Sequence, residues 1–288
     1  MRENFLERRS FLTLTPVYAI ATKKVITVSP HESLAVVREL MVKHGISRVV
    51  IIEGERPVGL VTKKDIIKFL ALDDTERSLI EIPVSEVMSG NLVLVRPDLD
   101  VRTVANIMLD SDISSLLVVD GEKLLGIATK TDICRYYAEH CKGVFKVRDF
   151  MTPHVIYVKP MHSLFRVMNL MIKHNISRVL VLSDDHKPIG IVTLTDLTFY
   201  TSSLRPVKHP TFETIPSSLI LTAEDVMTRD PITIREDEDL SKAPELMLEK
   251  RISGLPVVNE NGRLSGIITK SDVVKAVASF KGPYSSGT

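Results

Sequence analysis

The sequence predicts an α+β protein of four β-α-β-β-α repeats that pair into two modules. A seven-residue stretch from glycine to aspartate occurs four times, and we call it the Gly-Asp motif. Its copies are GLVTKKD at 59–65, GIATKTD at 126–132, GIVTLTD at 190–196 and GIITKSD at 266–272. The terminal aspartates recur at intervals of 64 to 76 residues, which is longer than the period of most solenoid and propeller repeats. Each copy therefore belongs to a small domain-like repeat.

The sequence before each motif also keeps a fixed register. Each repeat contains a Ser or Asp followed by an apolar residue, then a methionine seven residues after that apolar residue, then an Ile-Ser pair five residues further on. The methionines are Met41, Met108, Met171 and Met247, and the isoleucines are Ile46, Ile113, Ile176 and Ile252. Four copies in one register indicate duplication of a whole repeat.

Composition indicates a globular protein. The chain has 288 residues, 44% of them hydrophobic, and a formal net charge of +1. Such a chain can bury a sizeable core and shows no global charge bias towards nucleic acid or membrane. A repeat of about 50 ordered residues buries too small a core to be stable alone, so repeats of this size are expected to pack in pairs.

The first two elements of each repeat are a strand and a helix. The strands are predicted from short β-branched runs. These runs are Val25 to Val28, Leu92 to Val95, Val155 to Val158 and Ile232 to Ile234. A Ser or Asp follows at the N-cap position, and apolar residues then recur at helical spacing, as at Leu34, Val37 and Met41. This spacing predicts an amphipathic helix of about three turns.

A hairpin and a second helix complete each repeat. Two extended apolar runs joined by a polar turn predict the hairpin. Its first strands are Val49 to Ile52, Leu116 to Val119, Val179 to Leu182 and Pro256 to Val258. The second strand runs into the Gly-Asp motif, and the second helix begins near the end of the motif.

These elements place repeat 1 at 15–72, repeat 2 at 82–141, repeat 3 at 147–202 and repeat 4 at 222–280. The residue after the Ile-Ser pair is Arg48, Ser115, Arg178 and Gly254 in turn. This alternation indicates that a two-repeat module was itself duplicated, which gives modules 15–141 and 147–280. Residues 1–14 form an N-terminal arm, the Ser-, Thr- and Pro-rich segment at 201–221 is an irregular loop, and 281–288 form a frayed tail.

The simplest interpretation of the motif is a helix capping box. In such a box the threonine accepts from the first-turn amides and the aspartate reaches back. The motif glycines would then relieve crowding where a strand meets another backbone. The same geometry also suits a ligand, because a helix N-terminus favours phosphate and a carboxylate can accept both hydroxyls of a ribose. Chemistry alone favours capping over ligand binding.

Four repeats that end in G-h-h-[ST]-x-[ST]-D, where h is apolar, resemble cystathionine β-synthase (CBS) domains. Four of them in tandem are similar to archaeal quadruple-CBS proteins and to the γ regulatory subunit of AMP-activated protein kinase. The resemblance covers about residues 15–280. It implies two Bateman modules, each with two related clefts that bind adenosine derivatives such as AMP, ADP, ATP or S-adenosylmethionine.

The resemblance also implies which residues form the sites. The motif aspartates would hold ribose hydroxyls, and the motif Thr and Ser residues would face phosphate or ribose. These residues are Thr62, Asp65, Thr129, Thr131, Asp132, Thr193, Thr195, Asp196, Thr269, Ser271 and Asp272. Adenine would lie against the first strand of the partner repeat, at Ile26, Val93, His154, Ile156 and Ile232. This pairs Asp65 with 91–93, Asp132 with 24–26, Asp196 with 230–232 and Asp272 with 154–156.

Arg48 and Arg178 match positions where the family places phosphate-binding basic residues; the alternative is a solvated arginine at a strand edge. Repeat 3, which combines Arg178 with Asp196, is the most complete candidate. In repeat 1, Lys64 replaces the second hydroxyl, so that site either favours a more highly charged phosphate chain or is blocked. Repeats 2 and 4 lack the arginine, and their sites could bind a neutral-tailed adenosine derivative, borrow a basic group from a neighbour, or stay empty.

The leading functional hypothesis is a non-catalytic sensor that binds an adenosine-derived small molecule and changes its affinity for a protein partner, which the sequence does not identify. The chain has no Walker-type loop, no G-x-S-x-G stretch and no metal-ligand cluster, so no catalytic residue, metal ligand or catalytic cofactor is expected. The alternative is a ligand-free interaction scaffold or a nucleic-acid-associated regulator. Nucleic acid is not the expected partner, because the net charge is +1 and only 5% of residues are aromatic.

The cysteines and the hydropathy predict the cellular setting. Cys134 and Cys141 are seven residues apart on one predicted helix, about 10 Å by helical rise, which is too far for a disulfide. Reduced thiols and the lack of a membrane-spanning apolar run predict a cytoplasmic protein without a membrane partner. Either a monomer, in which two modules close into a pseudo-symmetric disc, or a homodimer is expected.

Overall fold

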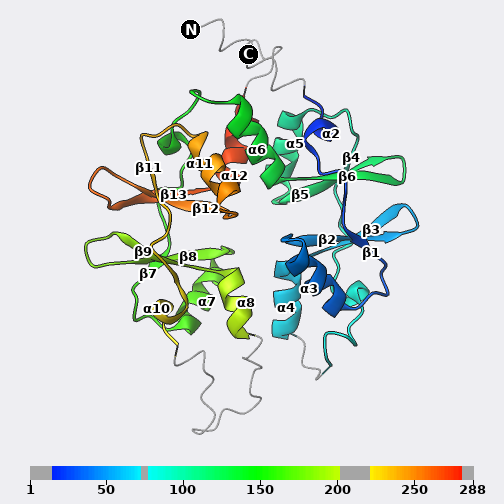
Figure 1. Cartoon of the computed structure of the whole chain (residues 1–288), viewed down its shortest axis with the longest axis horizontal. Coiled ribbons are helices and arrows are strands. Elements are labelled where there is room, and N and C mark those ends of the chain that lie inside the picture. The colour runs from blue at the N-terminus through cyan, green and yellow to red at the C-terminus, as the bar shows by residue number, and fades with distance from the viewer. Residues whose placement is uncertain (1–14, 73–76, 202–220, 281–288) are drawn as a thin grey trace, which may run out of the picture. The chain divides into compact units, whose positions relative to one another are not determined.

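The computed structural model describes residues 15–72, 77–201 and 221–280 (Figure 1). The predicted arm at 1–14, nearly all of the loop at 201–221 and the tail at 281–288 lie outside the described residues. The chain divides into two compact units, the first holding residues 1–141 with 274–288 and the second holding residues 142–273. Repeats 1 and 2 lie in the first unit, and repeat 3 and most of repeat 4 lie in the second.

Every repeat has the predicted order of strand, helix, hairpin and helix, preceded by a short helical turn. Repeat 1 contains α2 (Val17–Ile20), β1 (Thr27–Val28), α3 (Leu34–Lys43), β2 (Arg48–Glu53), β3 (Arg56–Thr62) and α4 (Lys63–Leu72). Repeat 2 contains η1 (Val84–Glu86), β4 (Leu94–Val95), α5 (Val101–Asp110), β5 (Ser115–Asp120), β6 (Lys123–Thr129) and α6 (Lys130–His140). Repeat 3 contains η2 (Val147–Asp149), β7 (Tyr157–Val158), α7 (Leu164–Lys173), β8 (Arg178–Leu182), β9 (Pro188–Thr193) and α8 (Leu194–Thr201). Repeat 4 contains α10 (Ala223–Val226), β10 (Thr228–Arg229), β11 (Ile234–Arg235), α11 (Lys242–Glu249), β12 (Gly254–Val258), β13 (Leu264–Thr269) and α12 (Lys270–Ala278). The α+β fold class is confirmed.

Each repeat forms its own small sheet. In repeat 1, β1 pairs parallel with β2, and β2 pairs antiparallel with β3, so the strand order is β1-β2-β3. The sheets of the other repeats have the same core order. The hairpin register sets Arg48 opposite Thr62, and the equivalent pair in repeat 3 is Arg178 opposite Thr193. The residue after each Ile-Ser pair is thus fixed beside the motif threonine of its own repeat.

The first strand of each repeat is shorter than the β-branched runs predict. Only Thr27 and Val28 of the run at 25–28 pair as β1, and β4, β7 and β11 are equally short. In repeat 4 the strand is shifted to Ile234–Arg235. The residues just before each short strand connect it to a backbone contact with the partner repeat. Their apolar character therefore marks a lead-in segment rather than a longer strand.

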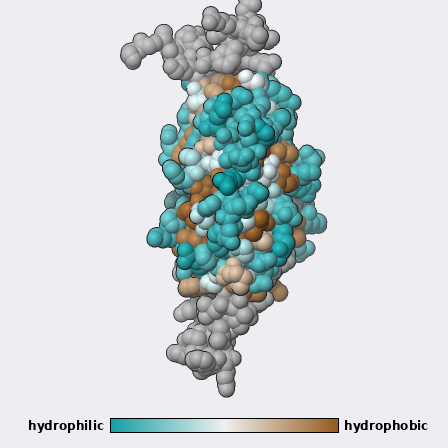
Figure 2. Space-filling model, turned by 90° about the vertical axis from the view of Figure 1, so that its left-hand side faces the viewer, coloured by the Kyte–Doolittle hydropathy of each residue, from teal (hydrophilic) through white to brown (hydrophobic). Residues whose placement is uncertain are grey.

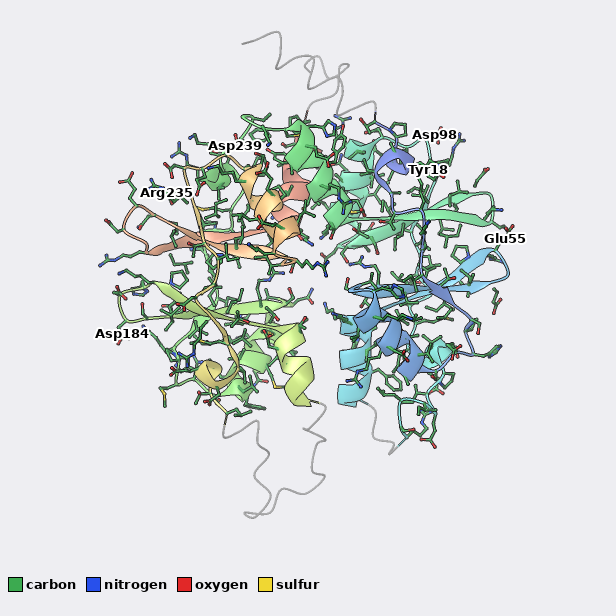
Figure 3. All side chains as sticks on the ribbon, viewed as in Figure 1. Tyr18, Glu55, Asp98, Asp184, Arg235 and Asp239 are labelled. Carbon is green, nitrogen blue, oxygen red and sulfur yellow. The ribbon has the colours of Figure 1, made fainter. Side chains whose placement is uncertain are left out.

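The predicted N-caps hold in three repeats. Ser33 Oγ accepts from Val36 N at 3.4 Å, and Ser163 Oγ and Asp100 Oδ1 accept in the same way. In repeat 4 helix α11 begins at Lys242, later than its counterparts. The reason is that Asp239, labelled in Figure 3, accepts from Ser241 N at 2.8 Å and from Gly143 N at 2.6 Å. Its carboxylate is thereby engaged outside the helix.

The methionines in register are core residues. Met41, Met108, Met171 and Met247 are all at most 3% exposed. In repeat 1 the core around Met41 includes Leu34 and Val37 of α3, Val49 of β2 and Val61 of β3. The recurring methionine therefore reflects packing of the first helix on the hairpin.

The two repeats of a pair interlock through their lead-in segments. The backbone before β1 bridges Thr22 with Ile127 of β6, and Ser89 of repeat 2 bridges back to Leu60 of β3. The second pair repeats this exchange, because Thr152 bridges Ile267 of β13 and β10 pairs antiparallel with β9. Each lead-in thus lies along the motif-bearing strand of its partner. This reciprocal pairing explains why the repeats occur in twos.

The motif glycines are required by this contact. A Cβ on Gly126 would lie 3.0 Å from the Thr22 carbonyl oxygen, and a Cβ on Gly266 would lie 2.8 Å from the Thr152 carbonyl oxygen. At Gly59 and Gly190 the added atom would collide with the sulfur of Met88 and Met227, respectively. The interpretation that glycine relieves crowding against another backbone is confirmed at Gly126 and Gly266.

Gly266→Ala is expected to lower the free energy of unfolding by about 2 kcal/mol, because the new methyl group overlaps a backbone carbonyl that cannot rotate away. The measurement is urea denaturation of the full chain followed by circular dichroism. Gly90→Ala is the matched control, since a Cβ at Gly90 meets nothing within 4 Å, and a change within about 0.5 kcal/mol is expected. Equal stability of both variants would contradict the tight approach at Gly266.

Within the described ranges, no helix is long and apolar enough to cross a bilayer. The face shown in Figure 2 is mainly hydrophilic with scattered hydrophobic patches. Exposed apolar side chains on repeat 3 include Tyr157, Met161 and Phe165. Scattered exposed apolar residues are ordinary for globular proteins and do not by themselves indicate a partner.

Candidate functional site

The Gly-Asp motif forms the same hydrogen-bonded box in all four repeats. In each, Oδ2 of the aspartate accepts from the backbone N–H of the threonine three residues earlier and from its hydroxyl. The N···O distances are 2.8, 2.8, 2.7 and 2.9 Å for Thr62–Asp65, Thr129–Asp132, Thr193–Asp196 and Thr269–Asp272. The hydroxyl distances are 2.6 to 2.7 Å. The capping interpretation of the motif is confirmed, and each threonine hydroxyl proton is held inside the box.

The box by itself does not identify a ligand site. Thr222 and Asp225, which lie outside the motif at the start of α10, form the same box with distances of 2.8 and 2.7 Å. Hydrogen bonds from the backbone and hydroxyl of Thr222 lower the pKa of Asp225. What distinguishes the motif aspartates must therefore be their surroundings.

The surroundings divide the four aspartates into two kinds. Asp132 and Asp272, from repeats 2 and 4, are 3% and 2% exposed, whereas Asp65 and Asp196 are only half-buried. A buried carboxylate is costly unless it is paired with a positive charge or hydrogen-bonded. Asp132 meets this need partly through Arg135, whose Nη1 lies 3.0 Å from Oδ1. The even-numbered repeats thus hold the buried carboxylates.

The arginines come from the odd-numbered repeats. Arg48 interacts electrostatically with Asp132, and Arg178 interacts with Asp272. Burial lowers the pKa of Arg48, and it lowers the pKa of Arg178 to about 10, while the nearby carboxylate opposes the shift in each case. With a pKa of about 10, the Arg178 guanidinium remains charged at neutral pH.

This arrangement corrects one expected grouping. Arg178 was expected to serve Asp196 of its own repeat, but the carboxylate that acts on it is Asp272 of repeat 4. The cause is the interlocked pairing, which turns the start of each hairpin towards the partner repeat. This interaction favours, among the three alternatives for repeats 2 and 4, a basic group borrowed from a neighbour.

The two arginines differ in their hydrogen bonds. Arg178 Nη1 donates to the Ser253 carbonyl at 2.6 Å, and Nη2 donates to Ser253 Oγ at 2.8 Å and to Ser177 Oγ at 3.2 Å. Arg48 Nη2 donates to Ser47 Oγ at 3.4 Å. Arg48 Nη1 is buried and has no hydrogen-bond partner within the described part of the chain. The expectation of a solvated arginine does not fit either residue.

The remaining predicted site residues flank these groups. The residues two positions after the motif threonine are half-buried at Thr131 and Ser271 and exposed at Thr195. The bridges to the partner repeats lie two to four residues before the predicted adenine-contacting residues, which are Ile26 and Val93 in the first pair and His154, Ile156 and Ile232 in the second. His154 is exposed and Ile232 is 38% exposed, while Ile26, Val93 and Ile156 are half-buried. Ile26 and Val93 use their carbonyl oxygens to accept from Val50 and Leu117 of the adjacent strands.

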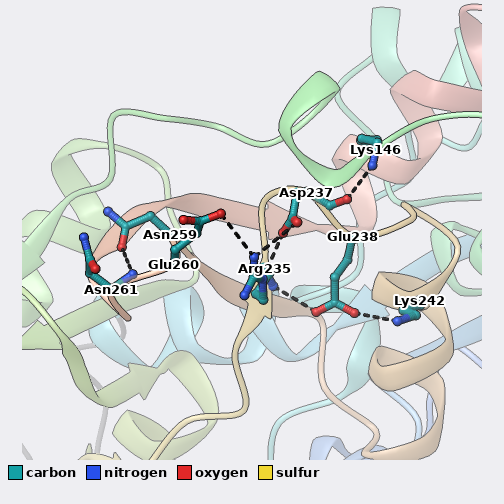
Figure 4. Close-up of polar contacts among 8 residues, drawn as sticks. All are labelled: Lys146, Arg235, Asp237, Glu238, Lys242, Asn259, Glu260 and Asn261. Atoms are coloured by element: carbon teal, nitrogen blue, oxygen red, sulfur yellow. Dashed lines mark hydrogen bonds and ion pairs between the residues drawn. The ribbon is translucent and has the colours of Figure 1, made fainter.

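The densest polar cluster of repeat 4 lies elsewhere (Figure 4). Arg235 contacts Asp237 at 2.9 Å and Glu260 at 3.7 Å, and Lys242 contacts Glu238 at 2.7 Å. A shallow surface pocket beside this cluster is lined by Arg148, Asn259 and Asn261 among others. Exposed ion pairs of this kind contribute little energy. The acidic stretch before α11 is a solvated network, as its position predicts.

Within the described residues, no group of three or more His, Cys, Asp or Glu side chains could hold a metal ion. Cys134 lies on α6 and Cys141 directly follows it, and both are buried thiols. The arginines and the motif aspartates can hold an anion and hydroxyl groups, respectively.

Sequence reasoning missed four residues of the site. Ser253 and Gly254 receive Arg178, Arg135 pairs with Asp132, and Ser115 is a buried polar residue at the position equivalent to Gly254. The alternation of Arg48, Ser115, Arg178 and Gly254 was the available signal. This alternation showed that the four positions differ, but it did not show which residues of the partner repeat lie near each arginine.

The fold and site define a class: proteins made of interlocked repeat pairs with a motif carboxylate at the start of each second helix. The CBS domain family matches residues 17–72, 84–139, 147–202 and 223–279. The chain therefore belongs to the CBS domain family, with four domains paired into two Bateman modules.

Several known proteins are similar to this chain. An uncharacterised protein of Methanocaldococcus jannaschii, MJ1225, is 28% identical over 270 residues, which cover 89% of this chain and 96% of that protein. Its crystal structure, described as that of a candidate archaeal homologue of g-AMPK, has a TM-score of 0.76 at 27% identity and covers 91% of this chain and 99% of that one. A conserved protein of Pyrococcus horikoshii at 19% identity shares the fold, with a TM-score of 0.66 over 91% of this chain and all of that one.

Proposed function

We propose that this protein is a non-catalytic regulatory protein that binds an adenine nucleotide, AMP, ADP or ATP, in clefts between its paired repeats. The observation that carries the proposal is the electrostatic interaction between a buried aspartate of one repeat and a half-buried arginine of its partner. A carboxylate for ribose hydroxyls and a guanidinium for phosphate are the two polar groups that such a ligand needs.

The structure supports a distinct role for each kind of side chain. The capping box uses Oδ2 of the motif aspartate, so a ribose hydroxyl would donate to Oδ1, which at Asp132 also accepts from Arg135 Nη1. The half-buried side chains of Ile26 and Ile156 suit the adenine ring, since they lead in along the motif strands of Asp132 and Asp272. Arg48 would then meet the phosphate of the nucleotide at Asp132, and Arg178 that of the nucleotide at Asp272.

The sites at Asp65 and Asp196 would differ. Their aspartates are half-buried, and Arg48 and Arg178 are engaged with the even-numbered repeats. An adenosine derivative without a phosphate, such as S-adenosylmethionine, suits these sites better than a nucleotide. Lys64 is exposed at the site of repeat 1, so it can still attract a phosphate chain from solution.

Regulation follows from where the ligand lies. A nucleotide held by residues of both repeats stabilises the arrangement in which the pair is closed, and it shifts the equilibrium only by its differential affinity for that arrangement. A protein partner that recognises the closed arrangement would be the receiver of the signal. Catalysis is not part of the proposal, and steady turnover of a nucleotide by the purified protein would contradict it.

Calorimetric titration of the full chain with AMP, ADP, ATP, adenosine and GMP tests the proposal. We expect adenine nucleotides to bind at micromolar to millimolar concentration. GMP should bind more weakly, because the lead-in residues that would contact the base are expected to fit adenine better than guanine. Native mass spectrometry of the same sample counts the occupied sites. Absence of binding by every adenine compound at millimolar concentration would contradict the proposal.

A further inference from the structure

The two modules carry a different residue at one equivalent position. Ser115 and Gly254 both follow an Ile-Ser pair, and both begin the first hairpin strand of an even-numbered repeat. Their register is the same, since Ser115 lies opposite the motif threonine Thr129 and Gly254 lies opposite Thr269. In each module the odd-numbered repeat supplies an arginine. The modules therefore pair arginine with serine in one case and arginine with glycine in the other.

Gly254 makes room for the arginine of its module. A Cβ built on Gly254 would collide with Nη1 of Arg178. Because that atom is missing, the guanidinium lies against the backbone and bonds both the carbonyl and the hydroxyl of Ser253, at 2.6 and 2.8 Å. Arg178 is thereby held by the protein itself.

Ser115 has no such space to offer. It carries a Cβ and a hydroxyl at the position where Gly254 has neither, and it is 8% exposed. Arg48 makes a single long hydrogen bond of 3.4 Å, to Ser47 in its own repeat, and its buried Nη1 has no partner within the described residues. The equivalent of Arg178's bonds to Ser253 is therefore missing for Arg48.

This difference has a consequence for an anionic ligand. An anion at Arg48 gains a hydrogen bond from a donor that loses none, whereas an anion at Arg178 must replace bonds that a charged donor already makes to Ser253. A hydrogen bond to a charged group changes an equilibrium by about tenfold or more. The same phosphate should thus bind more tightly at Arg48.

We propose that Ser115 and Gly254 determine which module accepts an anionic tail: Gly254 lets Arg178 close onto Ser253, and Ser115 leaves Arg48 available. The inference rests on the proposed function and adds a specificity to it. The site at Asp132 binds a phosphate-bearing adenosine derivative. The site at Asp272 binds a ligand whose tail forms fewer hydrogen bonds with Arg178.

Exchange of the two residues in the full chain tests this inference. AMP and adenosine are titrated separately, and the ratio of their dissociation constants measures how much the phosphate contributes at each site. In the natural sequence we expect one class of sites with a large ratio and one with a ratio near unity. Arg48→Met and Arg178→Met assign the two classes, since each removes the phosphate contribution from its own module only.

Gly254→Ser is expected to break the hydrogen bonds between Arg178 and Ser253. The phosphate contribution in the second module, measured as the ratio of the adenosine and AMP dissociation constants, should then rise by about tenfold. Ser115→Gly is expected to let Arg48 close onto its partner repeat and lower the contribution in the first module by a similar factor. Ser115→Gly removes atoms without adding any, so it keeps the test valid if Gly254→Ser fails to fold.

The outcomes separate the two proposals. If neither AMP nor adenosine binds, the proposed function fails. If both bind but the ratios are equal in the two modules, or neither ratio responds to the exchange, the proposed function stands and the role of Ser115 and Gly254 is wrong.

Discussion

Asp132→Ala is expected to lower the free energy of unfolding by about 2 kcal/mol and to abolish nucleotide binding at its site. The carboxylate accepts from the backbone and hydroxyl of Thr129, and loss of a helix cap costs about 1 kcal/mol. It is also the partner of Arg135, and its side chain is 4% exposed. The substitution therefore removes a cap and an ion pair, and also the acceptor that a ribose would use. Urea denaturation and calorimetry measure the two effects.

Asp225→Ala is the matched control for this change. Asp225 forms the same box with Thr222, but it lies at the exposed start of α10, outside the Gly-Asp motif. We expect a smaller loss of stability and unchanged nucleotide affinity. If Asp132→Ala bound AMP as the natural chain does, the motif aspartates would be caps and nothing more.

Arg48→Met is expected to remove the phosphate contribution to AMP binding while changing the free energy of unfolding by no more than about 1 kcal/mol, because loss of a buried donor that has no partner within the described residues offsets loss of the positive charge near Asp132. Burial lowers the pKa of Arg48, which means that its surroundings disfavour the charged form. A base whose pKa is lower in the folded than in the unfolded protein opposes folding at neutral pH, where it is charged in both states. Methionine fills similar space without a buried donor that lacks a partner.

Arg178→Met is the control at the equivalent position. Arg178 bonds Ser253 and Ser177, so its replacement removes these hydrogen bonds and should lower the stability more than Arg48→Met does. Thermal unfolding of both variants at neutral pH gives the comparison. A loss of more than about 1 kcal/mol in Arg48→Met would show that the arginine is a structural residue and not one kept for a ligand.

The repeat architecture could be predicted from the sequence because its signals are local. The Ser or Asp before each first helix, the methionine in register and the glycine of each motif depend on contacts with a short stretch of neighbouring structure. Met41 and its counterparts are buried as the helical spacing predicts. The capping box was also predictable, since Thr62 and Asp65 are three residues apart and bond each other directly.

The division of the site between repeats could not be predicted in the same way. Arg178 and Ser253 are 75 residues apart in sequence, and their contact depends on how two hairpins meet. The sequence does not show such contacts, because every repeat contains the motif. Only the pairing of the repeats decides which arginine lies near which carboxylate. For this reason the sequence favoured Asp196 as the partner of Arg178, whereas the structure assigns Asp272.

The first strands show a related limit. The β-branched residues at 25–28 have high strand propensity, yet only Thr27 and Val28 pair with β2. The preceding residues are held by the bridge from Thr22 to the partner repeat. Propensity identifies an extended segment, but the partner that pairs with it is a property of the fold.

The claim that adenosine derivatives bind between paired repeats is tested most directly by calorimetric titration of AMP into the full chain and into the Asp132→Ala/Asp272→Ala double variant. We expect saturable binding to the natural chain and loss of the sites at Asp132 and Asp272 in the double variant, with a native fold verified by circular dichroism. Unchanged binding by a folded double variant would contradict the account, because the ligand would then lie away from the buried aspartates and their borrowed arginines.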